Sequence, residues 1–78
     1  MSKAYHEAID VTLTDRQPQT IIWRMSTYTV LQTLDRWILQ NKWWEREEKR
    51  LYYLLETNRA TMEIYRVGPK WVLARIMD

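Results

Sequence analysis

The sequence contains no cysteine and no phenylalanine, and its 78 residues include a single glycine and a single histidine. Without cysteine, neither a disulfide bond nor a thiolate metal site can hold the fold together, and this composition suits a reducing cytoplasm. The glycine, Gly68, has no neighbouring glycines with which to form a phosphate-binding loop. The histidine, His6, lies in a segment without a strand or helix pattern, so no histidine base is expected in the folded part. We therefore expect no enzymatic activity, no metal and no cofactor.

Long apolar runs and strong charge are also absent. No segment approaches the roughly 18 apolar residues of a membrane-spanning helix, and the first residues lack the apolar stretch of a signal peptide. We therefore expect a cytoplasmic protein that does not bind a membrane. The 12 Lys+Arg and 10 Asp+Glu residues leave a net charge of +2, which is too small to attract nucleic acid over a long range. We expect one small β domain over residues 8–78, preceded by a flexible N-terminus at residues 1–7.

Tryptophan and tyrosine are abundant, with five of each in the chain. Every large ring therefore carries an N–H or an O–H group, and such rings suit places that are apolar on one side and wet on the other. Trp23 and Trp71 lie in period with aliphatic neighbours, and Trp37 is placed to close the end of a strand. We assign these three rings mainly to the core. The remaining rings are candidates for binding.

Several short segments show strand chemistry and are separated by turn residues. Ile9, Val11 and Leu13 alternate with polar residues, which is the period of a half-buried strand. Asn58-Arg59 is typical of a two-residue hairpin turn, because asparagine tolerates a positive φ. The pattern predicts an all-β fold of five to six antiparallel strands, folded as an SH3-like barrel or a small roll. The expected strands cover residues 9–14, 20–25, 28–33, 51–57, 61–66 and 71–77.

The segment 34–50 is ambiguous. It is rich in Leu, Gln, Lys, Glu and Arg, which favour helix, and Leu34, Ile38 and the Trp43-Trp44 pair form an approximate helical stripe. We favour a third strand that continues to about residue 37, followed by a loop or one short helical turn near residues 38–48 and a charged segment leading into the fourth strand. A helix over the whole segment is the alternative.

Trp43 and Trp44 are the first candidate for a binding site. Adjacent residues on extended backbone point in opposite directions, so one of the two rings should lie on the surface near Arg46. An exposed indole beside a guanidinium group is suited to anchor a protein partner or to serve as a stacking platform for a single-stranded base. The structural alternative is that the second ring covers the open end of a small barrel.

Tyr52 and Tyr53 present the same geometry, with one ring inside and the other outside, next to Tyr65. Two exposed tyrosines on neighbouring strands are typical of the base-stacking face of small β-barrels that bind nucleic acid. Cross-strand packing that only stabilises the sheet is the alternative. The candidates for the phosphate contacts that such a face would need are Arg24, Arg36, Arg66 and Arg75, provided that they converge on one face.

Five spaced segments also resemble one known family. They are the run 34–37, Trp43-Trp44-Glu45, the segments 53–57 and 62–66, and the closing segment 71–78. This pattern resembles an uncharacterised bacterial family of small tryptophan-rich β domains, found alone or at the C-terminus of catalytically inactive Y-family polymerase-like mutagenesis proteins. The resemblance covers about residues 20–78. It implies a non-catalytic accessory domain connected with DNA repair or translesion DNA synthesis. Relatives tend to have glycine in the turn after residues 56–57, where this chain has Asn58-Arg59-Ala60.

The residues therefore support two functions. The first is a non-catalytic module that docks a protein through an aromatic surface around residues 37–53. The second is weak binding of single-stranded nucleic acid, and self-association through the aromatic surface is also open. The expected protein-binding residues are Trp43, Trp44, Arg46 and Tyr52, and the expected nucleic-acid-binding residues are Tyr52, Tyr65, Arg24 and Arg66.

Overall fold

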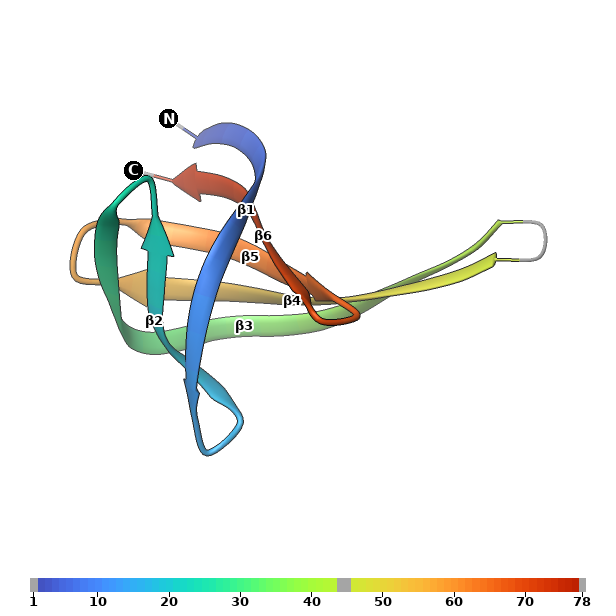
Figure 1. Cartoon of the computed structure of the whole chain (residues 1–78), viewed down its shortest axis with the longest axis horizontal. Coiled ribbons are helices and arrows are strands. Elements are labelled where there is room, and N and C mark those ends of the chain that lie inside the picture. Colours follow the sequence, from blue (N-terminus) through green and yellow to red (C-terminus); the bar gives the residue numbers. More distant parts are fainter. Residues whose placement is uncertain (1, 44–45, 78) are drawn as a thin grey trace.

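The computed structural model describes the backbone of residues 2–43 and 46–77, and the side chains of residues 3–40 and 49–77. These residues form six antiparallel strands and no helix, and β1 pairs with β6 to close a small barrel (Figure 1). The prediction of an all-β, SH3-like barrel is confirmed. The strands are β1 (Ser2–Thr14), β2 (Gln17–Trp23), β3 (Ser26–Trp43), β4 (Arg46–Thr57), β5 (Thr61–Val67) and β6 (Lys70–Met77).

Two long strands each pair with different neighbours along their length. β1 pairs with β6 up to Ile9 and with β2 from Asp10 onwards. β3 pairs with β2 up to Thr29 and with β4 from Val30 onwards. Because each long strand contributes to two parts of the sheet, six strands are enough to enclose a core.

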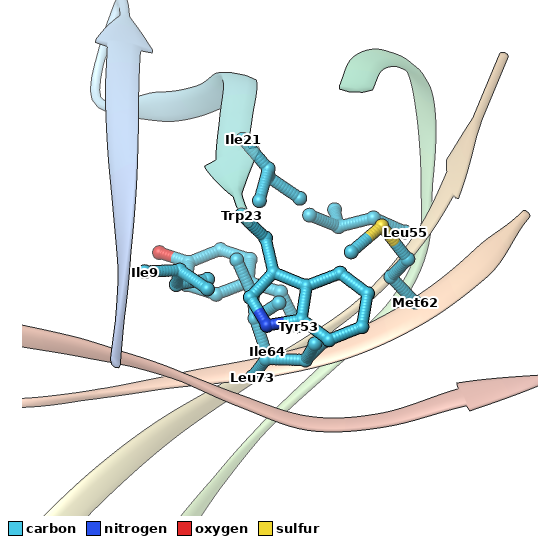
Figure 2. Close-up of a cluster of buried hydrophobic side chains, with 8 residues drawn as sticks. All are labelled: Ile9, Ile21, Trp23, Tyr53, Leu55, Met62, Ile64 and Leu73. Carbon is cyan, nitrogen blue, oxygen red and sulfur yellow. The ribbon is translucent and has the colours of Figure 1, made fainter. Parts of the chain in front are cut away.

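The core lies between the strands, and its largest fully buried side chains come from β2, β4, β5 and β6. Ile21 and Trp23 extend from β2 towards aliphatic side chains of the opposite strands (Figure 2). Trp23 is 8 % exposed and belongs to the core, as predicted, and Trp71 is partly buried against it. Trp37 is not a member of the core. The clustered core residues are Ile9, Ile21, Trp23, Tyr53, Leu55, Met62, Ile64 and Leu73.

Two-residue turns connect β1 to β2 and β2 to β3. Asp15 and Arg16 form the first turn, and Arg24 and Met25 form the second; all four have a positive φ, which matches the twist of adjacent strands. The expected strand 20–25 therefore ends two residues early, because Met25 is fully exposed in the turn rather than facing the core.

The loop from β4 to β5 contains no glycine and is held by side-chain hydrogen bonds instead. Thr57, 5 % exposed, donates its hydroxyl to the Ala60 carbonyl (2.7 Å) and accepts from the backbone N–H groups of Arg59 (3.2 Å) and Ala60 (3.0 Å). The side-chain oxygen of Asn58 accepts from the Thr29 N–H at 3.0 Å. The loop is thus three residues long rather than the expected two, and its polar groups are satisfied without a glycine.

The first strand begins earlier than the sequence indicates. Residues 2–7 belong to β1 and pair with β6, whereas a strand was expected only from Ile9. The register shifts between Ala4 and Glu7, and His6 within this bulge has a φ of 60°. A bulge adds one residue to a strand and interrupts its alternation, which explains why this segment shows no period.

The segment expected to form a loop or short helical turn near residues 38–48 is strand wherever the structure describes it. β3 continues to Trp43, and β4 begins at Arg46, directly opposite it. The expected loop and the alternative helix over 34–50 are therefore both wrong for the described residues. The two strands form a long ribbon that projects away from the barrel (Figure 1). We call its outer part, residues 38–43 and 46–50, the arm.

Candidate interaction surface

Two of the predicted anchor residues, Trp43 and Arg46, have their backbones at the far end of the described part of the arm. Trp44 and the side chains of Trp43 and Arg46 lie outside the described residues. The backbones of Trp43 and Arg46 form the last pair of the β3–β4 ladder. The described part of the candidate surface is therefore the base of the arm.

Tyr52 and Tyr53 point to opposite faces of β4, as predicted. Tyr53 is 4 % exposed in the core, and Tyr52 lies on the outer face, where it stacks on Trp37 with ring centroids 5.2 Å apart and planes inclined by 5°. Tyr65, directly opposite Tyr52 on β5, has its ring centroid 5.0 Å away. We call Trp37, Tyr52 and Tyr65 the aromatic row.

A cation completes the aromatic row. The guanidinium carbon of Arg50 lies 4.8 Å from the centroid of Tyr65. Arg50 precedes Tyr52 by two residues, so both side chains share one face of β4, and Tyr65 is the diagonal neighbour of Arg50. Tyr65 is only 7 % exposed, so its ring is not available to stack on a nucleotide base. Contacts within the aromatic row therefore cover Tyr65, whereas the half-buried rings of Trp37 and Tyr52 remain partly accessible.

Exposed aliphatic side chains gather on β3. Leu31, Leu34, Ile38 and Leu39 are 43–60 % exposed, and they make up four of the seven large hydrophobic residues that are exposed in the described part of the chain. The register of β3 against β4 shifts at two bulges, which leave Leu31 and Leu34 without a direct partner. Bulges can redirect side chains. After Thr29, no second strand pairs with β3 in the described residues.

Arg24 is part of a structural cluster rather than of the aromatic row. Its Nη2 and Nε atoms donate hydrogen bonds to the two carboxylate oxygens of Glu7, at 2.6 Å and 3.2 Å. The guanidinium carbon lies 4.6 Å from the Trp23 ring centroid. The Trp23 N–H also donates to Glu7 (3.1 Å), and Tyr5 meets the Trp23 ring edge-on at 4.8 Å. The hydrogen bond from Arg24, and then that from Trp23, lower the pKa of Glu7. This cluster fastens the bulged start of β1 to the β2–β3 turn.

Arg66 also has partners outside the aromatic row. Its Nε donates to the Gly68 carbonyl at 2.9 Å, and its guanidinium carbon lies 5.8 Å from the Trp71 ring centroid. The structure therefore brings together only Tyr52 and Tyr65 of the predicted nucleic-acid set. Arg50, the cation that lies over the ring of Tyr65, was not in that set. The sequence signal that could have identified it is its position two residues before Tyr52, on the same face of the strand.

Two hollows lie beside the β5–β6 turn. The smaller, about 260 Å³, is lined by Ile38, Lys49, Leu51, Arg66 and Gly68. The larger, about 600 Å³, lies where β1 leaves β6 and is lined by residues 8–11 and 69–72. Sequence reasoning missed the smaller hollow, because it exists only when β3 and β4 remain paired beyond the barrel.

Other kinds of site have no support in the part of the chain that the structure describes. No group of three or more histidine, aspartate or glutamate side chains there could hold a metal ion. No helix there is long and apolar enough to cross a membrane. The chain matches no protein-family model, no curated protein and no solved structure. The geometry of the described residues is therefore the basis for the functional inference.

Proposed function

We propose that this protein is a non-catalytic interaction module that docks a protein partner through the outer face of the β3–β4 ribbon. The observation that supports this proposal is the exposed side chain of Leu39, which lies two residues from Trp37 on the same face of β3, next to the stacked Trp37–Tyr52 pair. Contiguous exposed apolar surface marks interaction sites, and aromatic and arginine side chains dominate their binding energy. Leu39 and Arg50 are direct cross-strand partners beside this pair, so apolar, aromatic and cationic groups adjoin.

The pair is held in place before a partner arrives. A stacked aromatic pair contributes about 0.5–1.5 kcal/mol beyond the area that it buries. A partner that covers Trp37 and Tyr52 would therefore not need to order two free rings, and the loss of side-chain entropy on binding would be small. The predicted contacts of Trp43, Trp44 and Arg46 would extend the same interface along the arm.

A protein partner fits this surface better than single-stranded nucleic acid. The exposed side chain of Leu39 beside the Trp37–Tyr52 pair is aliphatic, and the charge of Arg24 is compensated by Glu7. Nucleic-acid binding depends on uncompensated positive charge close to accessible stacking rings. The resemblance described above adds translesion synthesis or DNA repair as the context of this proposal, and the lack of cysteine adds a cytoplasmic location.

A photo-crosslinking amino acid placed at residue 39 tests the proposal. The matched control places it at Leu13, an exposed leucine on β1 with a similar exposed fraction (45 % against 43 %). We expect a defined adduct with one protein from position 39 only. Binding of that purified protein should then weaken in the Leu39→Ser and Tyr52→Ala variants and persist in Tyr52→Phe, which keeps the ring.

Equal adducts from positions 13 and 39 would contradict the proposal, as would unchanged binding by Leu39→Ser. A separate titration with oligo-dT distinguishes the nucleic-acid alternative. Quenching of tryptophan fluorescence that weakens steeply with salt would favour that alternative. Sedimentation at several concentrations shows whether the partner is a second copy of the chain.

A further inference from the structure

The smaller hollow lies on the opposite face of the ribbon from the aromatic row. Leu51 precedes Tyr52 and packs partly against the core, so it points to the core side of β4. Ile38 is its direct partner on β3, and Arg66 is its direct partner on β5. These three residues and Lys49 surround a space that the β5–β6 turn borders at Gly68.

The size of the hollow suits a side chain rather than a cofactor. Its volume of about 260 Å³ is below the roughly 300–1,000 Å³ of small-molecule sites. A methyl group added at Gly68 would have no heavy atom within 4 Å, so the turn does not close the hollow. Ile38 is 56 % exposed beside it and offers an apolar contact.

The charge of the hollow is positive and is not compensated within the described residues. Lys49 and Arg66 are the charged residues in its lining. Other arginines pair with carboxylates: Arg24 with Glu7 at 2.6 Å and Arg75 with Glu63 at 3.5 Å. Arg66 is instead positioned by a neutral carbonyl and by an aromatic ring. A guanidinium group held in this way is oriented and still available to a carboxylate.

The backbone beside the hollow can also accept a strand. The last pair between β4 and β5 is Leu51 with Arg66, and β5 ends at Val67, whereas β4 begins at Arg46. The edge of β4 on the hollow side therefore has no neighbouring strand before Leu51 in the described residues. An extended peptide can pair with such an edge while its alternate side chains enter adjoining pockets.

We propose that this hollow binds an extended acidic peptide segment of a partner. Its carboxylates would meet Arg66 and Lys49, and an aliphatic side chain between them would pack on Ile38 and Leu51. In a strand, residues two apart share one face, so acidic and aliphatic residues separated by one position would all face the hollow, with the aliphatic side chain entering it and the carboxylates at its rim. This contact is independent of the outer surface, because it uses the opposite face of the ribbon.

Fluorescence polarisation with a fluorescein-labelled Glu-Ser-Leu-Ser-Glu peptide tests the proposal. Binding should weaken as salt rises, and it should be lost with Lys-Ser-Leu-Ser-Lys and reduced with Glu-Ser-Ser-Ser-Glu. Lys49→Gln should weaken binding by up to about fivefold, the range of an exposed ion pair. Arg66→Gln should weaken it by about tenfold, since charged hydrogen bonds are stronger. Arg16→Gln, the same charge change in the β1–β2 turn, should have no effect.

Amide chemical shifts locate the peptide and separate this proposal from the docking function. Shifts at Ile38, Leu51 and Gly68 would support it, and shifts confined to Tyr52 and neighbours on the outer face would overturn it. Absence of binding at the lowest salt would also overturn it. So would equal loss in Arg16→Gln and Lys49→Gln, because general charge attraction would then be sufficient. The proposed docking function depends on neither variant and would survive these failures.

Discussion

Replacement of Thr57 by valine is a stringent test of how this barrel closes the loop between β4 and β5. The substitution preserves the shape of the side chain and removes a hydroxyl that makes three hydrogen bonds. The Ala60 carbonyl keeps a second donor, the backbone N–H of Thr57 at 3.0 Å. The N–H of Arg59 is in an exposed residue and can bind water. The N–H of Ala60, in a half-buried residue, loses its acceptor.

The size of the effect follows from these contacts. A typical hydrogen bond contributes about 0.5–1.5 kcal/mol, and a buried donor without an acceptor costs about 1–3 kcal/mol. Of the three backbone groups that lose the hydroxyl, only the Ala60 N–H is left without another hydrogen-bond partner. We therefore expect Thr57→Val to lower the unfolding free energy by about 2 kcal/mol. This loss corresponds to a decrease in Tm of roughly 8–16 °C for a domain of this size. Thr57→Ser is the matched control and should cost at most about 1 kcal/mol, because only a methyl group is lost.

Urea unfolding followed by tryptophan fluorescence measures both variants. A change of less than about 0.5 kcal/mol for Thr57→Val, the range of ordinary surface substitutions, would refute the role of the hydroxyl. An equal loss in Thr57→Ser would show that the methyl group, rather than the hydrogen bonds, is responsible. Either result would require another explanation for a tight loop without glycine.

Three further predictions concern the ribbon and the start of β1. A double-mutant cycle with Trp37→Leu and Tyr52→Leu, measured by urea unfolding, should give a coupling energy of about 0.5–1.5 kcal/mol; a value near zero would contradict the stacking. Leu39→Ser should change the unfolding free energy by less than about 0.5 kcal/mol, and a larger loss would show that this leucine belongs to the core. Arg24 lowers the pKa of Glu7. The ionised Glu7 therefore stabilises the folded state at pH values above the ordinary pKa of glutamate, and this stabilisation is lost as the pH falls through the lowered pKa. Glu7→Gln should therefore reduce the acid dependence of stability in pH-dependent unfolding, and an unchanged profile would contradict this.

Strand alternation predicted the barrel well where the strands face a single core. Ile64 and Met62 on β5 and Tyr53 and Leu55 on β4 point inward, and Tyr52 points outward, as the period of two requires. These assignments need no knowledge of the partner strand. A side chain in such a segment faces either the core or the outside, and apolar residues recur on the core side.

The ribbon could not be predicted in the same way. Leu34 and Ile38 are four residues apart, a helical spacing, but Leu34 is a bulge residue and Ile38 lies beyond the barrel. One extra residue in a strand changes the spacing of its neighbours, so the period no longer identifies a strand. The pairing of β3 with β4 decides the structure of this segment. The stack of Trp37 on Tyr52, for example, joins residues 15 positions apart, which a local sequence window does not compare.

The arm has an energetic consequence for function. None of its described side chains is buried: residues 38, 39, 40 and 49 are exposed, and residue 50 is half-buried. Ordering the backbone of one residue costs about 1–2 kcal/mol, and these residues return little of that through burial in the core. A two-stranded hairpin alone is only marginally stable in water. The arm adds little to the stability of the barrel, yet it carries exposed apolar groups on both faces, Leu39 outside and Ile38 on the core side. The proposed contact with a partner would bury these apolar groups and would offset the cost of ordering the arm.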